Sequence, residues 1–115
     1  MSKNAEITAR IRQLNDELRR TLVTSVRGRV VMTQGVAALP ENEVVQLLER
    51  VRSFDYFTND NDPHGEHDFG GIELSGQTYF FKLDYYAPGM DGGSEDPADP
   101  EKTTRVLTIM RADEY

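Results

Sequence analysis

The residue types that could support chemistry gather in one loop, residues 54–71. This segment holds both histidines of the chain, His64 and His67, and five of its twenty acidic residues, and it contains no Lys or Arg. An imidazole beside carboxylates is the usual arrangement for proton transfer and for metal binding. Pro63 and Gly65 restrict the backbone between them. A binding or catalytic loop needs such rigidity, and so does a self-hydrogen-bonded turn.

A metal site requires a donor spacing that this loop supplies only in part. His64 and His67 are three residues apart, which allows both to reach one ion from a turn. However, the sequence reads His-Gly-Glu-His instead of His-Glu-x-x-His, and Pro63 and Gly65 disfavour the helix on which zincin chemistry depends. A calcium loop counted from Asp60 places Gly71 at position twelve, where a bidentate Glu is required. We therefore expect no bound metal and no cofactor.

Catalysis lacks a recognisable nucleophile. Ser53, Ser75 and Ser94 lie outside any nucleophile elbow or Ser-x-x-Lys context. Gly70-Gly71 precedes a predicted strand, whereas a phosphate-binding glycine loop precedes a helix. We expect no catalytic residue. The alternative is a small metal-assisted or His/Asp hydrolase built on Asp62, His64, His67 and Asp68.

A structural interpretation explains the same residues. Asp and Asn side chains of the segment 60–62 would hydrogen-bond their own backbone in successive Asx turns, and Pro63 and Gly65 would fix the bend. His67 and Asp68 would then brace the loop against the strand that follows. A loop made rigid in this way can also bind a partner at a low ordering cost.

Two helices are predicted from apolar periodicity. Over residues 5–22, apolar residues recur at intervals of three and four, and Arg10, Arg12, Arg19 and Arg20 lie mostly off that stripe. Ser2 or Asn4 can cap this helix. A second helix is expected to begin at Pro40, a favourable first helical position, with Val44, Leu47, Leu48 and Val51 forming its stripe.

Strands are predicted around and after these helices. Residues 30–33 form a short β-rich run, residues 69–74 and 78–86 flank a hairpin turn at residues 75–77, and residues 104–111 have apolar residues on both faces, as in a central strand. Between the last two strands lies a long acidic loop, residues 87–103, of a length that is usually functional or mobile. The expected fold is α+β, with two helices packed on a mainly antiparallel four-stranded sheet in the order α-β-α-β-β-β.

Composition restricts the class of protein. A length of 115 residues fits one domain, residues 1–115, and the absence of cysteine excludes disulfides and thiolate metal sites. No membrane span or secretion signal is evident, so the expected location is the cytoplasm. The net charge is −7, but residues 1–29 carry seven basic residues against three acidic ones. The acidic remainder repels nucleic acid and favours a basic partner.

Several segments together resemble one family of small bacterial proteins of unknown function. They are Leu14-Asn15-Asp16, Val31 to Val36, the block Asn61-Asp62-Pro63-His64-Gly65-Glu66-His67-Asp68-Phe69-Gly70, Lys82 to Tyr86, and Thr104 to Met110. The tract from Gly89 to Lys102 departs from the shorter connection expected there. The resemblance implies no catalytic residue. Members of that family are similar to accessory proteins of mobile elements, which often inhibit restriction or CRISPR complexes.

These observations lead to one functional expectation with two alternatives. We expect a non-enzymatic acidic binding protein, an anti-CRISPR or anti-restriction inhibitor that blocks the basic nucleic-acid-binding surface of a defence complex, without binding nucleic acid or membrane itself. The alternatives are the hydrolase and a homodimer formed through an exposed sheet edge. The expected partner-binding residues are Asp60, Asp62, His64, Glu66, His67, Asp68, Tyr85, Tyr86, Asp91, Glu95, Asp96 and Asp99.

Overall fold

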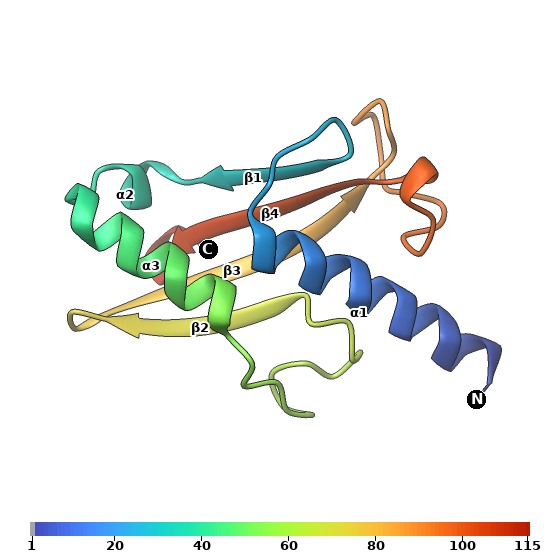
Figure 1. Ribbon diagram of the computed structural model, residues 1–115, viewed down its shortest axis with the longest axis horizontal. Coiled ribbons are helices and arrows are strands. Elements are labelled where there is room, and N and C mark those ends of the chain that lie inside the picture. Colours follow the sequence, from blue (N-terminus) through green and yellow to red (C-terminus); the bar gives the residue numbers. More distant parts are fainter. Residues whose placement is uncertain (1) are drawn as a thin grey trace.

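The computed structural model describes residues 2–115, which form an α+β fold with two layers. Helices α1 and α3 lie on the same face of a four-stranded sheet (Figure 1). The elements are α1 (Lys3–Thr21), β1 (Gly28–Met32), α2 (Gln34–Ala37), α3 (Glu41–Ser53), β2 (Phe69–Leu74), β3 (Gln77–Tyr86) and β4 (Thr104–Arg111), with short 3-10 helices η1 (Pro100–Lys102) and η2 (Ala112–Glu114).

The strand order across the sheet is β1-β4-β3-β2. Strands β2, β3 and β4 pair antiparallel, whereas β1 pairs parallel with β4. The sheet is therefore mainly antiparallel, as expected, and β4 is a central strand. Its register places Leu107 opposite Val30 of β1 and Ile109 opposite Phe81 of β3, so apolar side chains from neighbouring strands meet under the helices.

The core lies between the sheet and the helices. Burial alternates along β3, where Tyr79, Phe81 and Leu83 are buried while the residues between them are half-buried. From the helical layer, Leu47 and Val51 of α3 pack into the same cluster with no exposed surface. Removing each such side chain from water stabilises the fold by about 1.5–3 kcal/mol.

The expectation of two helices is wrong by one, since α2 lies between β1 and α3. Its residue Val36 is completely buried, and burial of this one side chain folds the segment after β1 into a single turn. The carboxylate of Glu114 holds that turn by accepting hydrogen bonds from the Gly35 amide at 2.9 Å and the Thr33 hydroxyl at 2.6 Å. These bonds, led by the one from Thr33, lower the pKa of Glu114.

The ends of the long helices follow local signals. The Ser2 hydroxyl caps α1 by accepting from the Ala5 amide at 3.1 Å, and α1 ends before Leu22, which adopts a left-handed φ of 55°. Pro40 precedes α3 as its N-cap residue and is not its first helical residue. Within residues 2–115, no helix is both long and apolar enough to cross a lipid bilayer.

Two neighbouring glycines of β2 differ in what surrounds them. A Cβ atom on Gly70 would overlap the ring of Phe81 and lie 2.9 Å from the ring of Phe54, whereas a Cβ atom on Gly71 would lie 3.6 Å from Phe80, an ordinary contact. Gly70 therefore allows the Phe54 and Phe81 rings, whose centroids are 5.2 Å apart, to pack against the sheet.

We predict that Gly70→Ala lowers the free energy of unfolding by about 2 kcal/mol, because added atoms strain a filled core. Gly71→Ala is the matched control, with an expected change within about 0.5 kcal/mol. Denaturation by urea measures both. Equal effects of the two substitutions would show that the core tolerates the added methyl group.

Candidate functional site

The histidine loop, residues 54–68 between α3 and β2, is shaped by side chains that accept hydrogen bonds from backbone amides of the same loop. The Asn61 side chain accepts from the Thr58 amide at 2.7 Å, and both carboxylate oxygens of Asp62 accept from the His67 amide, at 3.1 and 3.2 Å. Gly65 and His67 adopt left-handed φ values of 70° and 56°. The side chains of Asn61 and Asp62 therefore bond the backbone of their own loop, as expected, but the bonded amides lie three residues before Asn61 and five residues after Asp62, and not two residues on as in an Asx turn.

The imidazole of His67 lies between two carboxylates. Its Nδ1 is 2.9 Å from one carboxylate oxygen of Asp16 on α1, and its Nε2 is 3.8 Å from Asp62 of its own loop. The ring also stacks on Phe57, with centroids 3.8 Å apart and planes within 4° of parallel. We expected His67 to brace the loop against β2; its side chain instead fixes the loop to α1.

Arg19 extends this contact from α1 to the end of α3. Its side chain has no exposed surface, and one of its terminal nitrogens lies 3.0 Å from the Asp16 carboxylate. The other, Nη1, donates to the backbone carbonyls of Val51 at 2.9 Å, Arg52 at 3.2 Å and Phe54 at 2.8 Å. These carbonyls lie at the C-terminal end of α3, where Val51 accepts only a long backbone bond of 3.4 Å from the Phe54 amide, so a buried cation satisfies them and interacts favourably with the helix dipole.

Asn15 is the second buried polar residue of α1, and it connects the helix to the loop and to the sheet. Its amide donates to the Glu66 carbonyl at 3.0 Å and to the Tyr85 hydroxyl at 2.7 Å, while its carbonyl accepts from Arg105 Nε at 2.6 Å. The Tyr85 hydroxyl in turn donates to the Glu66 carboxylate at 2.8 Å. We call these residues, together with Asp16, Arg19, Asp62 and His67, the polar network.

Burial changes the pKa of several groups in and beside this network. Desolvation raises the pKa of Tyr85 far above its usual range, so its hydroxyl stays protonated and acts as a hydrogen-bond donor. Desolvation also lowers the pKa of Arg19 and of Arg105 and raises the pKa of Asp68, where the nearby Glu66 charge adds to the effect. Both arginines remain cations, because free guanidinium titrates so far above neutrality.

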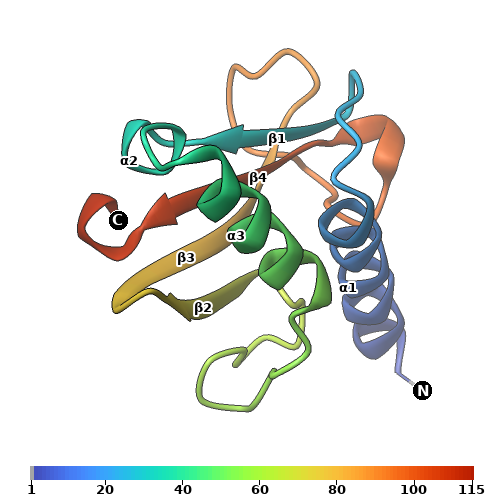
Figure 2. The same ribbon diagram turned by 60° about the vertical axis from the view of Figure 1, so that its left-hand side comes forward.

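The predicted site residues do not form one cluster. Figures 1 and 2 show the histidine loop and the acidic loop 87–103 on opposite sides of α1, so their carboxylates belong to separate surfaces. By exposure, Asp60, His64, Asp91 and Glu95 are exposed, Asp62 is buried, and Glu66, His67, Asp68, Tyr85, Tyr86, Asp96 and Asp99 are half-buried.

The chemistry available to the network is limited by how its groups are paired. An imidazole between two carboxylates can hold a proton, and an Asp–His pair is part of many hydrolytic sites. Among residues 2–115, however, no hydroxyl group is a hydrogen-bond partner of His67, and no three metal-binding side chains converge in a way that could hold an ion. The paired groups of the network instead connect α1 to the histidine loop, to the end of α3 and to the sheet.

Sequence reasoning missed Arg19, Asn15 and Arg105 as members of the site. Arg19 was placed off the apolar stripe of α1, where a charged residue is usually solvated. One signal was present in the sequence: Leu14-Asn15-Asp16 and the block from Asn61 to Gly70 both belong to the segments that carry the family resemblance. Nothing in the spacing indicated that these two segments would touch.

A comparison with protein families matches residues 32–114 to a family described as protein of unknown function, DUF3768. The chain belongs to this family. The matched residues include Asp62, Glu66, His67, Tyr85 and Arg105, while the α1 residues of the polar network lie outside them. Searches of curated proteins and of solved structures found no match.

We predict that Arg19→Ala lowers the free energy of unfolding by about 3 kcal/mol, because it leaves the carbonyls at the end of α3 without their buried donor and removes one of the partners of the half-buried Asp16 carboxylate. Arg20→Ala is the control: Arg20 is also within ion-pair distance of Asp16, at 4.0 Å, but 61% of its side chain is exposed.

Urea denaturation of both variants measures the difference, and the Arg20 variant should stay within about 0.5 kcal/mol of the wild type. A loss of equal size in the two variants would contradict the role given to Arg19.

Proposed function

We propose that the protein is a non-enzymatic binding protein whose acidic loop 87–103 covers a basic, nucleic-acid-binding surface of another protein. An inhibitor of a DNA- or RNA-handling defence complex, such as an anti-CRISPR or anti-restriction protein, acts in this way. The observation that carries the proposal is the structure of this loop. It contains five carboxylates and one basic residue, Lys102, and it is held in a defined shape by internal hydrogen bonds.

Two residues at the base of the loop fix its shape. The Thr103 side chain is fully buried, and the single proton of its hydroxyl is shared between the carbonyls of Asp96 at 3.0 Å and Asp99 at 2.9 Å. Ser94 lies 2.8 Å from the same hydroxyl and donates to the Lys102 carbonyl at 2.9 Å. At the other end, Gly93 forms an isolated β-bridge with Tyr86. A loop ordered before binding loses little entropy when it binds.

The five carboxylates divide into two groups. Asp96 accepts from the Ala98 amide at 3.2 Å, and Asp99 accepts from the Glu101 amide at 2.9 Å, so both shape the loop. Asp91, Glu95 and Glu101 are exposed; Glu95 forms an ion pair with Lys102 at 3.6 Å in which both side chains are more than half exposed. These three carboxylates can meet a basic surface and compete there with phosphates.

The competing hypothesis is a hydrolase that uses the histidine loop, and the contact that favours it is the hydrogen bond between His67 and Asp16. Three features of the two histidines disfavour the hydrolase and so favour the binding function. A carboxylate lies within 4 Å of each ring nitrogen of His67, one face of the ring is stacked on Phe57, and His64 is exposed and shares none of these contacts.

We predict that the triple variant Asp91→Asn, Glu95→Gln, Glu101→Gln loses about tenfold or more in partner affinity, because three charge contacts of about 0.5 kcal/mol each total about 1.5 kcal/mol. The matched control is Glu41→Gln, Glu49→Gln, which removes exposed carboxylates from α3, away from the loop.

The measurement is a pull-down from bacterial lysate with the wild type and both variants, at low and high salt, with and without a short DNA duplex. The proposal expects a partner that is lost in the triple variant, at high salt and on addition of DNA, but kept by the control variant. A partner retained by the triple variant and insensitive to DNA would overturn it.

A further inference from the structure

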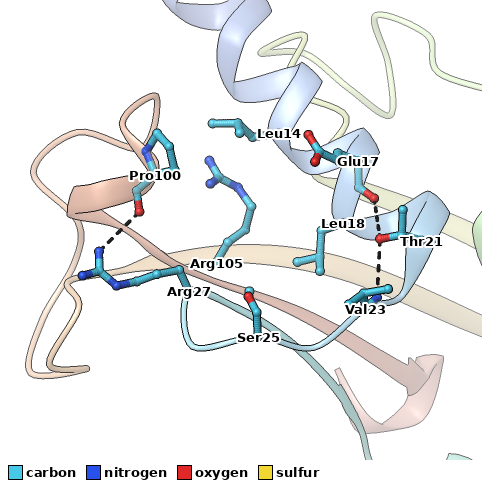
Figure 3. A pocket seen from close by; sticks show the side chains of 10 residues that line it. Leu14, Glu17, Leu18, Thr21, Val23, Ser25, Arg27, Pro100 and Arg105 are labelled. Atoms are coloured by element: carbon cyan, nitrogen blue, oxygen red, sulfur yellow. Dashed lines mark hydrogen bonds between the residues drawn. The ribbon is translucent and has the colours of Figure 1, made fainter.

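A hollow of about 290 Å³ lies beside the α1–β1 connection and is bordered on one side by Pro100 of the acidic loop. Figure 3 shows it between the C-terminal half of α1, the connecting segment and the start of η1. Leu14 and Leu18 of α1 and Val23 of the connection provide apolar walls, and the Arg27 and Arg105 side chains also line it. This volume is at the lower end of the roughly 300–1,000 Å³ found for small-molecule pockets.

Arg105 is the unusual residue in this hollow. Only 4% of its surface is exposed, yet within residues 2–115 no carboxylate lies within ion-pair distance of its guanidinium group. Its hydrogen bonds go to two neutral acceptors, the Asn15 carbonyl and the Pro97 carbonyl. A buried cation without a counter-ion is costly, and proteins usually pair such a group. Arg19, buried to the same degree, has Asp16 as its partner.

The unpaired part of this cation is turned toward the hollow. Nη1 of Arg105 has no hydrogen-bond partner among the described residues, and Figure 3 shows the guanidinium group pointing between Leu14 and Pro100. Arg27 approaches from the rim, where Nη1 donates to the carbonyls of Pro100 and Glu101. A ligand that reaches Arg105 therefore passes a second guanidinium group.

We propose that this hollow binds a small carboxylate with a short apolar chain. The carboxylate would accept from Arg105 Nη1 and supply the direct ion-pair contact that no carboxylate of residues 2–115 makes, while the chain would lie against Leu14 and Leu18. Charge-assisted hydrogen bonds of this kind are among the strongest that a protein makes. Exposed Glu17 also lines the hollow and repels anions held at the rim, so binding depends on the deeper arginine.

The test compares hexanoate with its uncharged analogue hexanamide and with inorganic phosphate, by NMR titration of the wild-type protein. We expect hexanoate to shift the methyl signals of Leu14, Leu18 and Val23, with an affinity at least about tenfold higher than that of hexanamide or phosphate. Equal binding of hexanamide would show that no anion is recognised. Equal binding of phosphate would show that the apolar chain is not recognised. Either result overturns the proposal.

Two variants distinguish binding in this hollow from a general attraction to the charge of the protein. Arg27→Gln should weaken hexanoate binding by about threefold to tenfold, because it removes the guanidinium group at the rim. Arg29→Gln removes the same charge two residues along the chain, from an exposed residue that does not line the hollow, and should leave binding unchanged. Equal losses in the two variants would show that only net charge matters and would contradict the proposed site.

Discussion

The buried ion pair between Arg19 and Asp16 is the interaction on which the arrangement of this fold depends. The guanidinium group of Arg19 has no exposed surface, and it joins α1 to the carbonyls that end α3. The Asp16 carboxylate that balances its charge is also the partner of His67 in the following loop. Burying a cation is costly unless its charge is balanced and its donors are bonded; in Arg19 both terminal nitrogens are bonded, while the buried Nε has no partner. These contacts add fixed polar connections between two helices and a loop that also meet in the apolar core.

The same principle separates the structural carboxylates from the exposed ones. Asp16, Asp62 and Glu66 accept hydrogen bonds inside the polar network, and Asp96 and Asp99 accept them within the acidic loop. Asp91, Glu95 and Glu101 remain at the surface of a loop whose backbone is already ordered. An excess of negative charge on a rigid surface favours binding to a basic partner, and that is the function proposed for this chain.

How much of the fold and of the site could be predicted from the sequence depends on how far apart the interacting residues lie along the chain. β2 and β4 were predicted to the residue, because strand periodicity and turn residues are local signals; α1 and β3 were predicted to within two residues. The turn around Asp62 is local as well. α2 was missed because it depends on residues that are distant along the chain: Val36 is buried in the core, and Glu114 accepts hydrogen bonds from Thr33 and Gly35. Arg19 and Arg105 were missed because the partners that join them to other elements, Val51 for Arg19 and Asn15 for Arg105, lie 32 and 90 residues away along the chain.

The measurement that tests this account most directly is a double-mutant cycle for Asp16 and His67. The free energy of unfolding would be determined by urea denaturation for the wild type, Asp16→Ala, His67→Ala and the double variant. If the polar network fixes the histidine loop to α1, the two substitutions are coupled by about 1 kcal/mol or more. Additive effects, with a coupling energy near zero, would mean that the hydrogen bond between these residues does not hold the loop in place.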